Sequence, residues 1–304
     1  MNILVTGATG FIGSHLCKQL IQRGHHVFAV SHSGRTHNIK SLLQCKEFHL
    51  ETGDIRDVDM MRNIIKNNRV KAVFHLAAQL RSDSDIKNPF LYFDINVGGT
   101  LNILNAAYLN SVDRFIYSSS MWVYSESPQY LPVDERHPVQ PSAIYGVAKL
   151  AGELYCNLYS KAMNIVVLRY SNAYGRGERE SYAIPTFINQ ALTNRPIKIH
   201  GDGTQTSDFV YVDDIVQGNL LAWEKNKPGV YNIGSGEEIS VRELAKRIIN
   251  ITNSKSEVVL TGKDTERPFR FFLDITKARK ALGYSPRSFD EGLRTYLKEF
   301  NVEV

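Results

Sequence analysis

The chain has 304 residues, 43% hydrophobic and 22% charged, which excludes a disordered protein and allows one large domain or two closely joined ones. Its net charge of +5 comes from scattered Lys and Arg residues, so no nucleic-acid-binding block is evident. No apolar run approaches the roughly 18 residues of a membrane span, and three widely spaced cysteines form neither a disulfide framework nor a zinc motif, so we expect a cytoplasmic protein without bound metal.

Short apolar strands alternate with helices up to Asn172. The first strand begins at Asn2, which leaves no room for a signal peptide. Apolar, near-continuous strands that alternate with helices predict an α/β fold with a parallel sheet covered on both faces. The predicted strands are residues 2–6, 26–30, 47–50, 70–76, 114–117 and 165–169. One predicted helix follows the first strand, another ends at about Asn68, and two more lie near residues 96–109 and 145–163.

The pattern changes after Asn172, where several glycines and prolines surround one predicted helix at 184–193. A helix at 213–224 and a strand at 230–233 follow. Ser240 and Glu243 have the spacing of a capping box that opens another helix. A strand at 257–260 and two short helices complete the chain. These segments predict a smaller lobe made from parts of the chain that leave the sheet and return.

The stretch TGATGFIG (residues 6–13) places Gly7, Gly10 and Gly13 between the first strand and the first helix. In such a loop the first glycine turns the chain, the second lets the backbone approach a pyrophosphate, and the third lets the helix pack on the strand. The N-terminus of the helix then offers unpaired N–H groups to the phosphates. A turn that merely requires glycine is the alternative, but the position of the motif favours a Rossmann-type doubly wound fold that binds a dinucleotide.

The second strand ends in Ser31-His32-Ser33-Gly34-Arg35, without the acidic residue that usually holds the ribose 2′-OH of NAD. Ser31 does not repel a 2′-phosphate, and His32 or Arg35 could pair with one. We therefore expect NADP(H) rather than NAD(H). The alternative is that these residues form an ordinary solvated loop.

Tyr145 and Lys149 are four residues apart on a predicted helix, and therefore lie on one face. An ammonium within about 4–6 Å of a phenol favours the phenolate, which can take a proton from an alcohol as a hydride leaves the same carbon. Ser118-Ser119-Ser120 ends a strand where a hydroxyl could hold the substrate oxygen. Each feature alone occurs by chance, but the glycine loop, the serine strand end and the Tyr/Lys pair occur in this order on the predicted elements.

Together these motifs resemble the extended short-chain dehydrogenases/reductases of the nucleotide-sugar epimerase/dehydratase group, from TGATGFIG to KALGYSP (280–286). The resemblance implies that Ser120, Tyr145 and Lys149 are catalytic, that GDIRD (53–57) flanks the adenine, and that HLAA (75–78) and NVGGT (96–100) support the cofactor. The expected cofactor-binding residues are Gly7, Gly10, Phe11, Ile12, Gly13, Ser31, His32, Ser33, Arg35, Asp54, Ile55, Leu76, Ala77, Ala78, Asn96, Tyr145 and Lys149.

The same resemblance implies a nucleotide-diphosphate sugar, linked to UDP, GDP or dTDP, as substrate. Its expected contacts are Gln79, Ser120, Asn172 and Arg267, with Arg267 on the phosphates. Two departures are evident, because Ser207 stands where relatives often carry Arg, and Phe269-Arg270 replaces a Gly-Asp pair. We expect a Rossmann domain of residues 1–172 and 209–234, a smaller C-terminal substrate-binding lobe of residues 173–208 and 235–304, and a homodimer formed through the helices near 96–109 and 145–163.

The serine strand continues Met121-Trp122, where sugar 4,6-dehydratases carry Asp-Glu. Neither side chain transfers protons, so dehydration is disfavoured and Tyr145 remains the proton carrier. A 4-epimerase acting through a transient 4-keto intermediate fits best. An NADPH-dependent reductase of 4-keto-6-deoxy-sugar nucleotides is the alternative. A catalytically inactive NADP-binding sensor or scaffold is disfavoured, because such proteins typically lack the Tyr/Lys pair.

Overall fold

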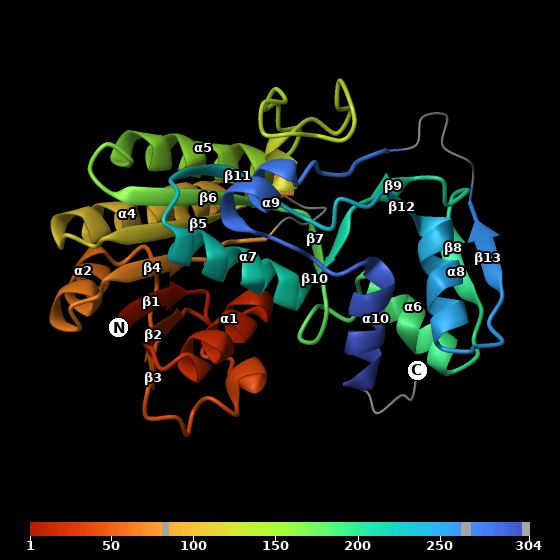
Figure 1. Ribbon diagram of the computed structural model, residues 1–304, viewed down its shortest axis with the longest axis horizontal. Coiled ribbons are helices and arrows are strands. Elements are labelled where there is room, and N and C mark those ends of the chain that lie inside the picture. The colour runs from red at the N-terminus through yellow and green to blue at the C-terminus, as the bar shows by residue number, and fades with distance from the viewer. Residues whose placement is uncertain (81–84, 263–268, 300–304) are drawn as a thin grey trace.

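The computed structural model describes residues 1–80, 85–262 and 269–299. A seven-stranded sheet forms its centre, and every pair of neighbouring strands is parallel (Figure 1). The order across the sheet is β11 (Gly229–Ile233), β6 (Asn164–Tyr170), β5 (Arg114–Ser120), β4 (Ala72–His75), β1 (Asn2–Thr6), β2 (His26–Ser31) and β3 (Phe48–Thr52). The predicted Rossmann-type doubly wound parallel sheet is confirmed.

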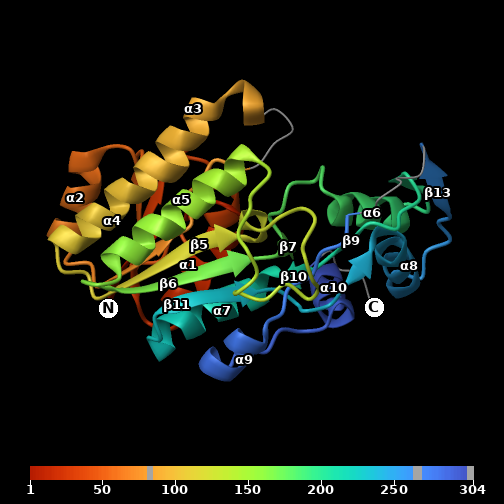
Figure 2. The ribbon, with the colours of Figure 1, turned by 90° about the horizontal axis from the view of Figure 1, so that it is seen from above.

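Helices cover both faces of the sheet, as Figure 2 shows. One face carries α2 (Val58–Asn67), α3 (Pro89–Tyr92), a π-helical segment (Phe93–Gly99), α4 (Thr100–Leu109) and α5 (Ile144–Tyr159). The other face carries α1 (Phe11–Gln22), α7 (Val212–Lys225) and α9 (Thr276–Leu282). Because both faces are covered, the middle of each central strand is apolar, and all four residues of β4 are buried.

Successive residues of β1 divide the core into two layers. Ile3 and Val5 pack with Leu16 of α1, whereas Leu4 packs on the opposite face with Ile103 of α4. All of these side chains are fully buried. The alternation follows from the pleat of the strand, which points neighbouring side chains to opposite faces.

The strand order reverses between β1 and β4. After β1 the chain runs to β2 and β3 on one side, and it then returns to β4, β5 and β6 on the other. In an open parallel sheet, the crevice beyond the carboxyl ends of the strands at such a switch point is where ligands bind. The glycine loop after β1 and the serines at the end of β5 both lie at this edge.

A smaller group of elements lies beyond the carboxyl edge of the sheet (Figures 1 and 2). Its core joins Ile188, Ile199, Leu244 and Leu293. The elements are β7 (Asn172–Tyr174), α6 (Ala183–Leu192), β8 (Ile197–His200), β9 (Thr206–Ser207), β10 (Phe209–Tyr211), β12 (Ile239–Ser240), α8 (Val241–Ile251), β13 (Val258–Thr261) and α10 (Phe289–Lys298). The chain enters this lobe after β6 and again after β11, while α9 packs back on α7 and β11. The domain limits given above stay a prediction.

Two helices of the lobe begin at serine N-caps. The Ser240 hydroxyl accepts from the Glu243 amide as expected, but the Glu243 carboxylate binds Arg247 instead of returning to the cap. The complete capping box is at α10, where Ser288 and Glu291 bond each other reciprocally. None of the helices in the described residues is long and apolar enough to cross a membrane.

Candidate active site

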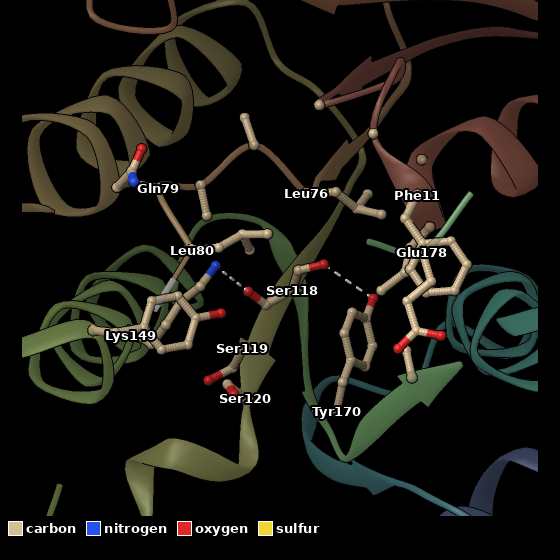
Figure 3. A pocket seen from close by; sticks show the side chains of 18 of the residues that line it. Phe11, Leu76, Gln79, Leu80, Ser118, Ser119, Ser120, Lys149, Tyr170 and Glu178 are labelled. Atoms are coloured by element: carbon tan, nitrogen blue, oxygen red, sulfur yellow. Dashed lines mark hydrogen bonds between the residues drawn. The ribbon is translucent and has the colours of Figure 1, made fainter. Parts of the chain in front are cut away.

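A cavity of about 950 Å³ opens at the carboxyl edge of the sheet, between the sheet and the smaller lobe. Its walls come from the glycine loop, the ends of β2, β4, β5 and β6, and the first turns of α5 (Figure 3). Tyr182, Ile184, Ser207 and Phe209 close it from the lobe. Its position is the crevice that the strand order predicts for a ligand.

Contacts of the glycine loop explain why two of its positions need glycine. A Cβ on Gly7 would meet the Ala77 amide nitrogen at 2.8 Å, and one on Gly13 would meet the Gly7 carbonyl oxygen at 2.2 Å. Gly7 also has a φ of +69°, in the left-handed region that favours glycine. Gly10 is the N-cap of helix α1 and has no side chain to cap it, and the first turn of this helix lines the cavity. Uncapped donors at a helix N-terminus suit a diphosphate, so the loop fits a dinucleotide.

Beyond the glycine loop, Ser31, His32 and Ser33 at the end of β2 form one end of the cavity wall, together with Asp54 and Ile55. The buried Ser31 hydroxyl bonds Thr9 at 2.6 Å, and His32 Nε2 lies 3.5 Å from the Asp54 carboxylate. The Arg56 guanidinium holds the same carboxylate through both oxygens and lowers the pKa of Asp54. Arg35 is exposed and does not line the cavity, because it lies past the turn at Gly34.

The segment after β4 runs along the cavity floor, where Leu76, Ala77, Ala78 and Gln79 line it. Asn96 lies behind this segment. Its side chain accepts from the Gln79 amide at 2.7 Å and donates to the Gln79 carbonyl at 2.9 Å. Asn96 is buried and does not itself line the cavity. Its side chain therefore fixes the backbone of this part of the cavity wall.

Buried His75 anchors the start of this segment. Its ring nitrogens bond the Thr6 and Thr100 hydroxyls at 2.7 and 2.9 Å. Burial and the nearby Lys149 cation lower the pKa of His75 to about 3, so the imidazole is neutral. His75 therefore joins β1, β4 and α4 rather than exchanging protons with a ligand.

Tyr145, Lys149 and Ser120 line the same cavity as the glycine loop. The Lys149 Nζ is 6.0 Å from the centroid of the Tyr145 ring and donates to the Ser118 carbonyl at 2.7 Å (Figure 3). Burial lowers the pKa of Lys149 to about 8. Both side chains enter the cavity from one side of α5, as their four-residue spacing predicts.

Two glycines of α5 allow this helix to pack closely against β5 and the residues that follow it. A Cβ on Gly146 would meet the Trp122 carbonyl oxygen at 2.1 Å, and one on Gly152 would meet the Tyr117 hydroxyl at the same distance. This close packing brings Tyr145 up to the end of β5, where Ser120 lies.

On the lobe side, Asn172 lines the cavity and its Nδ2 donates to the Ser207 hydroxyl. Ser207 also lines the cavity. It stands at the position where the family resemblance predicts Arg. Arg267 falls outside the described residues.

Comparison with known proteins agrees with this geometry. Residues 3–234 match the model of the NAD dependent epimerase/dehydratase family. The chain belongs to this family. It is 38% identical to a putative UDP-glucose 4-epimerase of Methanocaldococcus jannaschii, over 96% of each chain. Among solved structures, a UDP-glucose 4-epimerase of Thermotoga maritima with UDP-glucose superposes with a TM-score of 0.90 at 34% identity, over 99% of each chain. A Bacillus cereus UDP-glucuronic acid 4-epimerase with UDP-glucuronic acid and NAD gives 0.87 at 35% identity, over 99% of this chain and 100% of that one.

Beyond the family motifs, the cavity wall contains residues that the sequence did not single out for the site. Tyr170 accepts from the Ser118 hydroxyl at 3.0 Å and donates to Asn219 at 2.8 Å. Figure 3 shows Glu178 on the other side of Ser118 from Lys149. Burial raises the pKa of Glu178 to about 8. Glu178 follows Gly177 in a loop, and no periodic pattern in the surrounding sequence gave a signal for it.

A buried ion pair lies behind the serine strand. Arg169 binds both oxygens of the Glu153 carboxylate, at 2.9 and 2.6 Å, and Ser119 donates to the same carboxylate. Arg169 also donates to the Tyr124 hydroxyl. Glu153 lies one turn beyond Lys149 on α5, so this network joins α5, β5 and β6 directly beneath the site. Within residues 1–80, 85–262 and 269–299, no cluster of three His, Cys, Asp or Glu side chains could hold a metal ion.

Proposed function

We propose that the protein is an NAD(P)-dependent nucleotide-sugar 4-epimerase that acts through a transient 4-keto intermediate. The observation that carries this proposal is that Tyr145, Lys149 and Ser120 share one cavity with an uncapped glycine-loop helix. The arrangement puts a proton carrier, a cation and a hydroxyl beside the expected path of a dinucleotide.

Each residue has one task in the proposed reaction. Tyr145 takes the proton of the sugar C4 hydroxyl and later returns it to the keto oxygen. The Lys149 ammonium stabilises the phenolate that serves as base, and Ser120 holds the reacting oxygen by a hydrogen bond. A bound nicotinamide would supply the hydride acceptor and donor. Rotation of the 4-keto sugar between the two proton transfers inverts C4.

Residues beside Ser120 favour epimerisation over dehydration. Met121 is buried and Trp122 lines the cavity, and neither carries a proton that could leave with a hydroxyl group. Loss of water requires an acid beside the leaving hydroxyl and a base beside the adjacent carbon. The acidic side chains in the described cavity wall are Asp54, which lies beside His32, and Glu178, which lies across Ser118 from Lys149 (Figure 3).

The proposed substrate is a nucleotide-diphosphate sugar. Support comes from Asn172 and Ser207, which present polar groups at the lobe side of the cavity. Similar solved structures contain UDP-glucose or UDP-glucuronic acid. Arg267 stays a predicted phosphate contact.

The preferred cofactor form is proposed to be NADP(H). Ser31, His32 and Ser33 line the cavity without an acid among them, and Arg56 neutralises the nearby Asp54. His32 is thus the basic side chain in the wall that a 2′-phosphate could contact at that end. Isothermal titration with NAD+ and NADP+ tests this, and tighter binding of NAD+ would contradict it.

A homodimer is proposed through α4 and α5. Val147, Leu154 and Leu158 form an exposed apolar stripe on α5, and Tyr108 on neighbouring α4 is about half exposed. Figure 2 shows the two helices side by side on the outer face of the sheet. Light scattering should give twice the chain mass for the wild type, and the chain mass for Leu154→Glu/Leu158→Glu.

Incubation with UDP-, GDP- and dTDP-sugars, with and without NADPH, tests the proposed function. An epimerase inverts C4 of one of them and leaves the absorbance at 340 nm unchanged over many turnovers. A stoichiometric fall at 340 nm with a 4-keto-6-deoxy sugar, and no inversion at C4, would instead identify the reductase.

A further inference from the structure

The Ser118 hydroxyl begins a chain of hydrogen bonds that leads from the cavity into the core. It donates to the Tyr170 hydroxyl at 3.0 Å (Figure 3), and Tyr170 donates to Asn219 Oδ1 at 2.8 Å. Asn219 in turn donates from Nδ2 to the Ile215 carbonyl, one turn earlier on α7, at 2.8 Å. Ser118 and Tyr170 line the cavity, whereas Asn219 is fully buried. The chain therefore joins the end of β5 to β6 and α7.

The buried end of this chain fixes the direction of every hydrogen bond in it. The Ile215 carbonyl can only accept, so the Asn219 amide turns its nitrogen to it and its oxygen to Tyr170. That amide oxygen also can only accept, so the Tyr170 hydroxyl donates to it and must accept from Ser118. The hydrogen of the Ser118 hydroxyl is thus committed to Tyr170, and its oxygen offers lone pairs to the cavity. Ser118 is therefore a hydrogen-bond acceptor toward a bound molecule.

The place of Ser118 in the sheet decides which part of a dinucleotide it faces. A Rossmann fold holds the diphosphate at the loop after β1 and the adenosine ribose near the end of β2. Because β5 lies on the opposite side of β1 from β2, the nicotinamide half extends toward the end of β5. Ser118 and Ser120 are two residues apart on that strand, so they point to the same face and lie about 7 Å apart. A ring that exchanges hydride beside Ser120 would therefore carry its substituent toward Ser118.

That substituent is a carboxamide, which has N–H donors as the side-chain amide of Asn or Gln does. We propose that the Ser118 hydroxyl accepts a hydrogen bond from the carboxamide N–H of a bound nicotinamide, and that Tyr170 and Asn219 are positioning residues that keep it an acceptor. This hydrogen bond sets the rotation of the ring, and with it the ring face that meets the substrate. The inference rests on the proposed function, because it assumes a nicotinamide dinucleotide in the cavity. A sugar hydroxyl group is the other donor that could reach Ser118.

Calorimetric titration of the protein with two dinucleotides tests the contact. NAD+ carries the carboxamide, whereas 3-acetylpyridine adenine dinucleotide carries a methyl ketone, which has no N–H group. We expect the wild type to bind NAD+ at least about fivefold more tightly than the analogue, as one net hydrogen bond allows. Ser118→Ala should bind the two alike. ADP-ribose, which lacks the ring, should bind both proteins equally and so show that the mutant is folded.

Tyr170→Phe tests the direction of the hydroxyl group. Without the Tyr170 oxygen, the Ser118 hydrogen can turn into the cavity and donate to the ketone oxygen of the analogue. We expect the preference for NAD+ to fall below about twofold. Tyr284→Phe is the matched control, because Tyr284 is equally buried, donates to the Gly234 carbonyl at 2.9 Å and does not line the cavity. It should keep the wild-type preference.

Three results would overturn the inference alone, provided that the wild type binds NAD+. The wild type could bind NAD+ and the analogue equally, Ser118→Ala could keep the preference, or Tyr284→Phe could remove it as fully as Tyr170→Phe. Titration of the holoenzyme with UDP-glucose covers the other donor. A loss of UDP-glucose affinity in Ser118→Ala, with the NAD+ preference unchanged, would assign the contact to a sugar hydroxyl and contradict the carboxamide. If the wild type binds neither NAD+ nor NADP+, the proposed function is overturned with it.

Discussion

Lys149 lies one helical turn beyond Tyr145 on α5, and its Nζ is 6.0 Å from the centroid of the Tyr145 ring. The same Nζ donates to the Ser118 carbonyl at 2.7 Å, so the strand fixes the ammonium beside the phenol. The position is costly for a cation, since Lys149 is fully buried.

The cost of this buried cation should appear in the pH dependence of stability. Burial lowers the pKa of Lys149 from 10.5 to about 8. Between these values the unfolded chain binds more protons than the folded one, so the free energy of unfolding rises with pH. We expect the wild type to gain about 3 kcal/mol relative to Lys149→Met between pH 7 and 10.5. Urea unfolding of both proteins, without added dinucleotide, measures the difference, and parallel curves would refute it.

The ion pair between Arg169 and Glu153 should be sensitive to removal of one partner. Both side chains are 6% exposed, and Arg169→Met leaves the Glu153 charge buried beneath Ser119. We expect a loss of about 3–5 kcal/mol in the free energy of unfolding. Glu153→Leu/Arg169→Met should lose much less, because neither charge remains.

An exposed ion pair provides the matched control. Arg136 is 91% exposed and binds Asp134 at 2.7 Å. Arg136→Ala should change the free energy of unfolding by less than about 1 kcal/mol. Equal losses in Arg169→Met and Arg136→Ala would contradict the account of the buried pair.

Gly13→Ala should disrupt the glycine loop. Its Cβ would meet the Gly7 carbonyl oxygen at 2.2 Å, so helix α1 must move away from β1. We expect a lower melting temperature and at least about tenfold weaker dinucleotide binding, because the helix N-terminus no longer faces the phosphates. Gly98→Ala is the control, since the nearest atom to its Cβ is 3.8 Å away. It should leave binding unchanged, and a loss of binding equal to that of Gly13→Ala would argue against the steric account.

Glu178 should make dinucleotide binding depend on pH. Burial raises the pKa of this carboxyl group to about 8, and the group lines the cavity. Above that pH it carries a negative charge that repels a diphosphate, so binding should weaken by about 1 kcal/mol, or fivefold, as the pH rises from 7 to 9. Glu178→Gln should bind with a flatter profile in the same titration. Identical profiles for the two proteins would exclude the carboxyl group as the cause.

Local sequence patterns were sufficient for much of this site. The glycine loop and the Tyr145/Lys149 pair are set by a βα turn and by helical periodicity, which depend on neighbouring residues. Apolar runs likewise predicted the strands of the sheet to within a few residues, because a strand buried on both faces is apolar over most of its length.

The remaining features depend on contacts between distant parts of the chain. The stack of Trp122 on Phe269 joins segments that share no pattern, and Glu178 reaches the cavity from an irregular loop. Which residues of a loop reach the cavity was equally inaccessible, since Arg35 follows the turn at Gly34, is exposed and does not line the cavity. Burial sets such properties, and burial is decided by the assembled fold.

Steady-state turnover of Tyr145→Phe with a nucleotide sugar that the wild type epimerises is the most direct test of the account. The substitution removes one hydroxyl group and keeps the ring against Lys149. We predict that kcat falls by about 10²–10⁴-fold, while affinity for the dinucleotide and for the nucleotide sugar changes less than about threefold. If Tyr145→Phe keeps wild-type kcat, another group carries the proton and the proposed mechanism is contradicted.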